Sequence, residues 1–250
     1  MRGLAILVAA GCGRIGFASH AADPDAMIDS AIPDGIDAAS VAPAPRQRNA
    51  GYTNQLTTAV TLPSDVRAGS ALVAIALSQE QPAMTIADNL NQGWQVAGVA
   101  ISPTTGSKVN VWFACNAKAG AQTVSVTQSF NNGPVHVAIH EISDAAPTAC
   151  IDQQGQNVVA TTPVDQSVTS SGALTSNDEV VVAGFGAWFD AVTYVADLGD
   201  SLTATVRPSG TAPMGDTLAT VVSVRQSGVQ TIHVRGDHGT QYAAYLVSVR

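Results

Sequence analysis

The sequence predicts an all-β protein: an antiparallel β-sandwich, either jelly-roll or Ig-like, built from two similar halves. Val, Thr, Ser, Ala and Gly dominate the second half of the chain, a composition that favours strands and turns over helices. Gln122-Thr123-Val124 is matched by Gln230-Thr231-Ile232, 108 residues further along the chain. Turn residues recur about every 8–12 residues, as a sandwich or barrel requires.

The first half reads as strands separated by turns. Residues 56–62 are a strand candidate, and turn residues follow at 63–69. Residues 70–77 form a nearly continuous apolar run, which is typical of a central strand. Shorter or paired candidates and a closing hairpin complete the half: residues 84–86, 94–101, 108–115 and 120–142.

The second half repeats this order. Residues 163–185 again predict a strand, a turn and a central strand, and residues 70–74 match 178–182 at the same spacing of 108. We therefore expect an internal duplication spanning about 55–143 and 163–250, with roughly seven strands in each copy. The copies could contribute strands to shared sheets of one sandwich, or form two tandem Ig-like domains. The short connector between them favours the shared sandwich.

Turn and core residues carry a resemblance to known proteins. They are Thr61-Leu62-Pro63 with Ala68-Gly69, Ala87-Asp88-Asn89, Val111-Trp112-Phe113-Ala114 and His140-Glu141-Ile142-Ser143. In these, from about residue 53 onward, the chain is similar to a broad set of bacterial secreted and surface β-sandwich repeats of uncharacterised role. The resemblance implies fold and location, and it transfers no catalytic residue.

The chain begins with one basic residue, a short apolar run and a cysteine. The run is too short to span a membrane, which takes about 20 residues, but it fits a secretory signal. Ala9-Ala10-Gly11-Cys12 resembles the lipobox of bacterial lipoproteins, although Ala9 stands where Leu is usual. The resemblance implies a signal peptide at 1–11, lipid attachment to Cys12 and, with Gly13 following, the outer membrane. The alternative is a mis-started chain with an ordinary cysteine.

Residues 12–50 are expected to be a flexible tether rich in Asp, Ala and Pro, because they show no sustained apolar period. Their aspartates lack the Asp-x-Asp-x-Asp-Gly spacing of a calcium loop. The sandwich domain is therefore predicted to occupy 51–250.

The charge of the chain limits the classes of partner that it can bind, and its cysteines indicate a disulfide. The net charge is −8 and the 11 basic residues are scattered, so we expect no nucleic-acid partner; the membrane is expected only through the lipid. Outside the reducing cytosol, Cys115 and Cys150 are expected to form a disulfide, the alternative being two separate thiols. The chain has no Cys-x-x-Cys spacing of the kind that binds a structural metal, so no metal is expected. No cofactor is expected either.

The chain contains no familiar catalytic signature. The nearest candidate is a metal or catalytic cluster of His136, His140, Glu141 and Asp144, in which the two histidines share one face of a strand. The repeat carries Ala243, Val247 and Ser248 at the first three of these positions, so the fold does not need them. We therefore predict no catalytic residue and no metal site.

A better candidate follows the second central strand. Trp188, Phe189 and Tyr194, with Asp190, could form an aromatic platform that binds sugar rings through apolar contact and hydrogen bonds. Alternatively, the aromatic residues close the end of the core.

The sequence thus predicts a lipid-anchored, non-enzymatic envelope protein that acts in adhesion or ligand binding, with a glycan or an envelope protein as the partner. The alternatives are a hydrolase that acts on extracellular polymer through a carboxylate pair, and a purely structural envelope protein.

Overall fold

A computed structural model describes residues 41–79, 82–131, 133–187, 190–206 and 215–250 of the chain. These residues form strands and no helices, as predicted, and none of them forms a helix that could cross a membrane. The strands make four antiparallel sheets, two of five strands and two of three.

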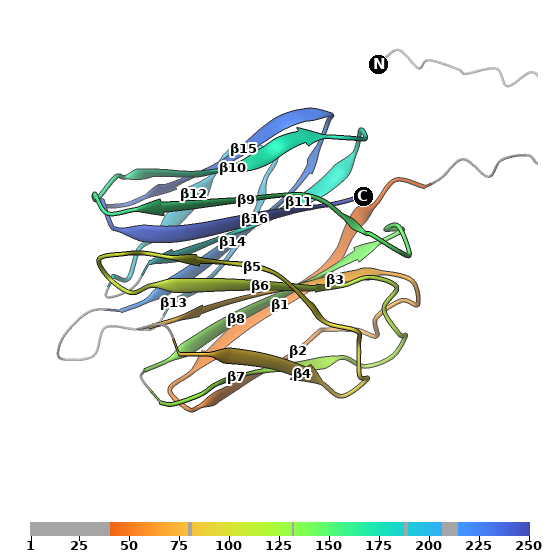
Figure 1. The fold of residues 1–250 in the computed structure, drawn as a ribbon, viewed down its shortest axis with the longest axis horizontal. Helices are drawn as coiled ribbons and strands as arrows, with labels where there is room; N and C mark the ends of the chain where they lie inside the picture. Colours follow the sequence, from red (N-terminus) through yellow and green to blue (C-terminus); the bar gives the residue numbers. More distant parts are fainter. Residues whose placement is uncertain (1–40, 80–81, 132, 188–189, 207–214) are drawn as a thin grey trace, which may run out of the picture. The chain divides into compact units, whose positions relative to one another are not determined.

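The first half forms two sheets of its own. The five-stranded sheet has the order β1-β8-β3-β6-β5, and the three-stranded sheet has the order β2-β7-β4 (Figure 1). The strands are β1 (Ala44–Thr53), β2 (Thr57–Thr61), β3 (Ala71–Ser78), β4 (Met84–Asp88), β5 (Gln95–Ile101), β6 (Lys108–Ala114), β7 (Thr123–Gln128) and β8 (Val135–Ser143).

The second half repeats this arrangement strand for strand. Its sheets have the orders β13-β14-β11-β16-β9 and β10-β15-β12, which are the same two orders advanced by eight strands. The strands are β9 (Ile151–Val159), β10 (Asp165–Leu174), β11 (Glu179–Ala187), β12 (Tyr194–Ala196), β13 (Ser201–Val206), β14 (Thr217–Arg225), β15 (Gly228–Gly236) and β16 (Tyr242–Val249).

The pairing within each half is nested. The first strand pairs with the eighth, the second with the seventh and the third with the sixth. These three nested pairs are those of an eight-stranded jelly roll, except that the fifth strand pairs with the sixth and not with the fourth. Of the two predicted sandwich types, the structure therefore has the jelly-roll type. The predicted duplication is confirmed, with eight strands in each copy rather than seven.

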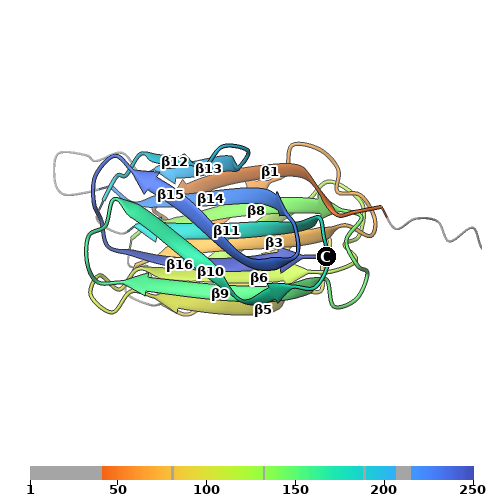
Figure 2. The same ribbon diagram turned by 90° about the horizontal axis from the view of Figure 1, so that it is seen from above.

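Three hydrophobic cores hold the four sheets together. One lies between the two sheets of the first half, and a second lies between the two sheets of the second half. The third lies between the two five-stranded sheets and includes Ile75, Val111, Val182 and Val247 (Figures 1 and 2). We call this third layer the junction. The preference for sheets shared by both copies was wrong: each sheet takes its strands from one copy, and the copies meet face to face.

The predicted spacing of 108 holds for the small sheets but not for the central strand. Val60 and Val168, 108 residues apart, both point into the core of their own half. Leu72 also points into its own half, whereas Val180 points into the junction and Val181 takes the inward position. The true spacing there is 109. A strand buried on both faces lacks the alternation that would fix its register, so the sequence match slipped by one residue.

The strands β1 and β9 fell outside the predicted repeat. β1 starts at Ala44, inside the range predicted to be tether, and β9 starts at Ile151, inside the predicted connector. Each lies at the edge of its sheet and pairs with one neighbour. Edge strands face solvent and need few apolar residues, so neither gave a hydrophobic signal.

The predicted disulfide is present. Cys115 follows β6 of the first half and Cys150 precedes β9 of the second, with their Cα atoms 5.7 Å apart. The bond therefore ties the two jelly rolls together beside the junction.

Candidate functional site

The predicted aromatic platform lies only partly within the described residues. Cys12, Trp188 and Phe189 lie outside them. Tyr194 is 5% exposed in the core of the second half, where its hydroxyl donates to Gln166 Oε1 at 3.1 Å. Burial raises the pKa of Tyr194. Its ring therefore presents no open face for a sugar.

Asp190 belongs to a different arrangement. Its Oδ1 lies 2.6 Å from His238 Nε2, and Asp237 Oδ1 lies 2.7 Å from Nδ1 of the same ring. The hydrogen bond to Asp190 raises the pKa of His238. Only a protonated imidazole donates from both nitrogens, so this pair favours the charged ring. The contact joins the segment after β11 to the turn between β15 and β16.

The four residues of the candidate metal cluster do not come together: His136, His140 and Glu141 lie on β8, and Asp144 follows its end. His136 and His140 share the junction face of β8, as predicted, but Glu141 points the other way. Asp144 instead pairs with Arg67 at 3.1 Å. In the described part of the chain, no three or more His, Cys, Asp or Glu side chains group as a metal would need.

Glu141 has a structural role. Its carboxylate accepts from Arg46 Nη1 at 2.6 Å, Gln47 Nε2 at 2.5 Å, Ser70 Oγ at 2.8 Å and the Arg67 amide at 2.8 Å. All these donors are satisfied by one buried carboxylate, which fastens β1 and the turn before β3 to β8.

His136 is also fixed by its neighbours. Its Nδ1 lies 2.9 Å from Thr205 Oγ1, its Nε2 lies 3.9 Å from Asp216 Oδ2, and its ring stacks on Tyr52 at 5.1 Å. The side chain is fully buried and links β8 of the first half to β13 of the second.

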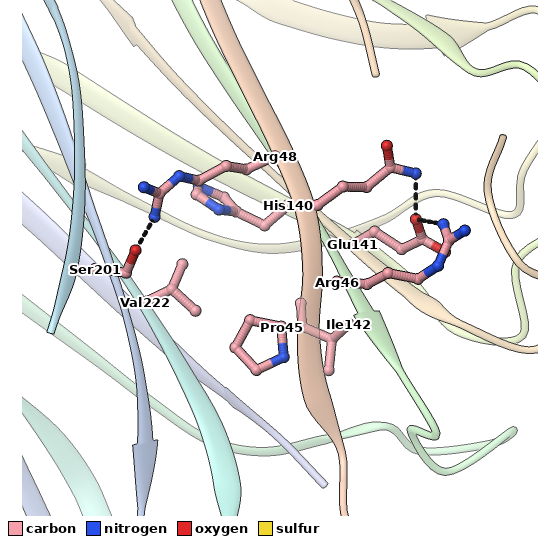
Figure 3. Close-up of a pocket in the computed structure, with 9 residues that line it drawn as sticks. Pro45, Arg46, Arg48, His140, Glu141, Ile142, Ser201 and Val222 are labelled. Carbon is pink, nitrogen blue, oxygen red and sulfur yellow. Dashed lines mark hydrogen bonds and ion pairs between the residues drawn. The ribbon is translucent and has the colours of Figure 1, made fainter. Parts of the chain in front are cut away.

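A pocket opens where β1 and β8 meet β13 and β14, at one edge of the junction. Its volume is about 220 Å³. Pro45, Ile142 and Val222 form apolar walls, and Arg48, His140 and Ser201 bring polar groups (Figure 3). We call this the Arg48–His140 pocket. Arg46, Gln47 and Glu141 also line the pocket, and Figure 3 shows Arg46 and Glu141 on the other side of β1 from Arg48 and His140.

His140 is unusual for a buried polar residue. It is 2% exposed, and neither ring nitrogen has a hydrogen-bond partner among the described residues. Burial, and then the charge of Arg48, lower its pKa to about 3, so the ring is neutral at neutral pH. Buried polar groups are normally hydrogen-bonded, so this one calls for an explanation.

Arg48 is the charged group of the pocket. Its guanidinium donates to Ser201 Oγ and, at 3.3 Å, to the Leu202 carbonyl. No carboxylate of the described residues forms a salt bridge with it. The nearby Asp200 is occupied by Arg225, which lies 2.9 Å from both of its oxygens.

The second half has other residues at the positions that match Arg48 and His140. Arg48 is the register partner of His140 on β1 and β8, and Gln154 is the partner of Val247 on β9 and β16. Gln154 Oε1 accepts from the Tyr245 hydroxyl at 2.6 Å. A second pocket of about 530 Å³ lies there, and its described lining, which includes Gln95, Cys115, Asp152 and Gln154, holds neither Arg nor His.

Sequence reasoning missed this pocket. Arg48 fell in the predicted tether, and Ser201 and Val222 come from the other copy. The one available signal was the replacement of His140 by Val247 in the repeat, which marks a residue that the fold does not require.

Comparisons with known protein families, with curated proteins and with solved structures gave no match for this chain.

Proposed function

We propose that this protein is a lipid-anchored, non-enzymatic cell-envelope protein that binds a ligand in the Arg48–His140 pocket. The anchor is Cys12, carried on the segment that precedes Ala44. Two features support the location: the lipobox-like sequence, and a disulfide between the halves, which is typical of proteins outside the reducing cytosol.

One observation carries the binding proposal, namely the difference between the two matching positions. The same fold places a hydrogen-bonded amide at Gln154 and a valine at Val247. At the matching positions of the first half, Arg48 has no salt bridge and His140 no hydrogen bond within the part of the chain that the structure describes. The fold does not require these two groups, and burial disfavours them, so ligand binding is the best explanation for their presence. Binding sites combine apolar walls with a few convergent polar groups in this way.

The glycan proposal now rests on this pocket more than on the aromatic segment, because Tyr194 is buried. The test is a glycan array probed with the full chain in mild detergent, beside the variants His140→Val and Trp188→Ala. We expect saturable binding that His140→Val abolishes and Trp188→Ala retains.

Each other outcome contradicts part of the proposal. Loss of binding in Trp188→Ala alone would move the site to the aromatic segment. Absence of binding would favour a structural envelope protein, and release of cleaved sugar would favour the hydrolase.

The anchor is tested separately by membrane fractionation of cells that express the chain. Cys12→Ser should move the protein from the membrane fraction to the aqueous one. If the distribution is unchanged, the lipoprotein assignment is wrong.

A further inference from the structure

The Arg48–His140 pocket has a counterpart at the other edge of the junction. At the first edge, Ser201 and Val222 are register partners on β13 and β14; at the second, Gln95 and Phe113 are register partners on β5 and β6. These strand pairs occupy the same places in the two halves, and Val222 and Phe113 both pack in the junction. The duplication therefore built two related pockets, and the second is the cavity of about 530 Å³ that Gln95 and Phe113 line, which we call the Phe113 pocket.

The Phe113 pocket has the size and the apolar wall of a ligand site. Its volume lies within the range of roughly 300–1,000 Å³ that is usual for small-molecule sites, whereas the volume of its counterpart lies below that range. Phe113 and Ile151 are partly buried against the junction core, and both line the pocket. An aromatic side chain in this place gives the C–H groups of a ligand ring a surface to contact.

The polar groups of the Phe113 pocket include three side-chain amides. Gln95 and Asn116 are exposed, and their side chains form no hydrogen bond with the rest of the described chain. Gln154 Oε1 accepts from the Tyr245 hydroxyl at 2.6 Å, which leaves the N–H donors of this amide available. An amide both donates and accepts, as a hydroxyl does, so these groups match a ligand that is rich in hydroxyls.

The charge of the pocket excludes an ionic ligand. Asp152 is the one charged side chain of its described lining, and its carboxylate already accepts from the Thr175 amide and hydroxyl at 2.8 Å each. Arg250 Nη1 lies 3.7 Å from the same carboxylate and offsets its charge. A charged group in this pocket would lose water without gaining an opposite charge, so the matching ligand is neutral.

We propose that the Phe113 pocket binds a neutral sugar residue, with one face of the sugar ring against Phe113 and its hydroxyls on the amides of Gln95, Asn116 and Gln154. This is a second ligand site, beyond the Arg48–His140 pocket of the proposed function. The two pockets share no lining residue, so each site stands or fails by itself.

The test is an NMR titration of the full chain in mild detergent, followed by the side-chain N–H signals of Gln95 and Asn116. The neutral sugars are D-glucose, D-galactose, N-acetyl-D-glucosamine and maltotriose. D-glucuronate adds a charge to the same kind of ring, and acetyl-trialanine amide is neutral but has no hydroxyl. We expect at least one neutral sugar to shift the signals saturably, and to bind more tightly than D-glucuronate and the peptide.

Two matched variants install the residues that the second half has at these positions. Gln95→Ser should weaken sugar binding by roughly two- to tenfold, as the loss of one neutral hydrogen bond predicts, and Asn116 remains the readout. Phe113→Val should weaken it by roughly fivefold or more, because the ring face is lost. Gln55→Ser changes an exposed glutamine outside both pockets and should leave the affinity unchanged.

Signals that no neutral sugar moves, or a shift that neither Gln95→Ser nor Phe113→Val weakens, would overturn the site. Equal or tighter binding of D-glucuronate would overturn the neutral ligand, and equal or tighter binding of the peptide would overturn the sugar.

The two binding sites are tested by separate experiments. A single sugar residue held by a few neutral hydrogen bonds binds with a Kd of roughly 1 mM, which is too weak to survive the washes of a glycan array. The array therefore reports on the Arg48–His140 pocket, and the titration reports on the Phe113 pocket. His140→Val should leave the titration unchanged, and weaker binding in that variant would overturn the independence of the second site.

Discussion

The two edges of the junction have the same backbone and different chemistry. At one edge, Arg48 and His140 pair across β1 and β8; at the other, Gln154 and Val247 pair across β9 and β16. At the second edge the Tyr245 hydroxyl donates to Gln154, and a pocket lined in part by Cys115 of the disulfide lies beside it. The difference teaches that the jelly-roll pair needs neither the cation nor the imidazole.

The same difference separates stability from function. A buried polar group without a hydrogen bond costs about 1–3 kcal/mol, a substantial part of the stability of a typical domain. His140 carries this cost and Val247 does not. Residues that oppose folding in this way are found where a protein meets a ligand.

The largest expected effect is at the disulfide edge. Replacing Cys115 and Cys150 by serine should lower the free energy of unfolding by about 4 kcal/mol, because the bond closes a loop with a sequence separation of 35. Urea unfolding measures the change. Ligand binding at the opposite edge should persist in the folded protein, and its loss would show that the two edges are not independent.

The acid sensitivity of His140 comes next. Its pKa falls from 6.5 in the unfolded chain to about 3 in the folded protein, so its contribution to stability is complete above pH 6.5 and is lost as the pH falls toward 3. Between pH 8 and pH 4 the wild type should lose about 3 kcal/mol more than His140→Val, at 1.36 kcal/mol per pKa unit. Parallel urea titrations at the two pH values give the difference. Equal losses would mean that His140 titrates normally.

The packing of the second edge predicts a smaller effect. A Cβ on Gly98 would overlap the Tyr245 hydroxyl and ring, so Gly98→Ala should lower the free energy of unfolding by about 2 kcal/mol. Gly93→Ala is the control, because nothing lies within 4 Å of its Cβ position. Thermal unfolding of both variants checks this, and equal melting temperatures would contradict the close fit of Tyr245.

The smallest effect concerns the charge at the first edge. Arg48→Gln should change stability by less than about 1 kcal/mol, because Arg48 is half-exposed and has no salt bridge to lose. It should nevertheless raise the pKa of His140, since the charge of Arg48 contributes to its lowering. An NMR pH titration of the ring reports the shift. An unchanged value would mean that Arg48 and His140 are not coupled.

The sequence predicted those parts of the fold that leave a clear pattern of apolar strands and turn residues. The duplication, the sandwich class and the Cys115–Cys150 bond were all predicted. The edge strands β1 and β9 were missed because solvent-facing strands leave little hydrophobic pattern. The sequence alignment of β3 with its counterpart β11 was wrong by one residue, because both strands are buried on both faces and show no alternation.

The site was harder to predict for a different reason. Its groups come from β1, β8, β13 and β14, and no local pattern brings Arg48 near Ser201, 153 residues away. Sequence reasoning found His140 but grouped it with Glu141, which the alternation of the strand sends to the opposite face. Only the packing of the two large sheets assembles the pocket.

The most direct test of the account is the free energy of unfolding of His140→Val at neutral pH, measured by urea denaturation against the wild type. The substitution installs the residue that the second half has at this position. If His140 is kept for a ligand against the preference of the fold, the variant should be more stable by about 1 kcal/mol. A variant that is less stable than the wild type would show that the fold needs the imidazole, and the argument for a binding site at this edge would fail.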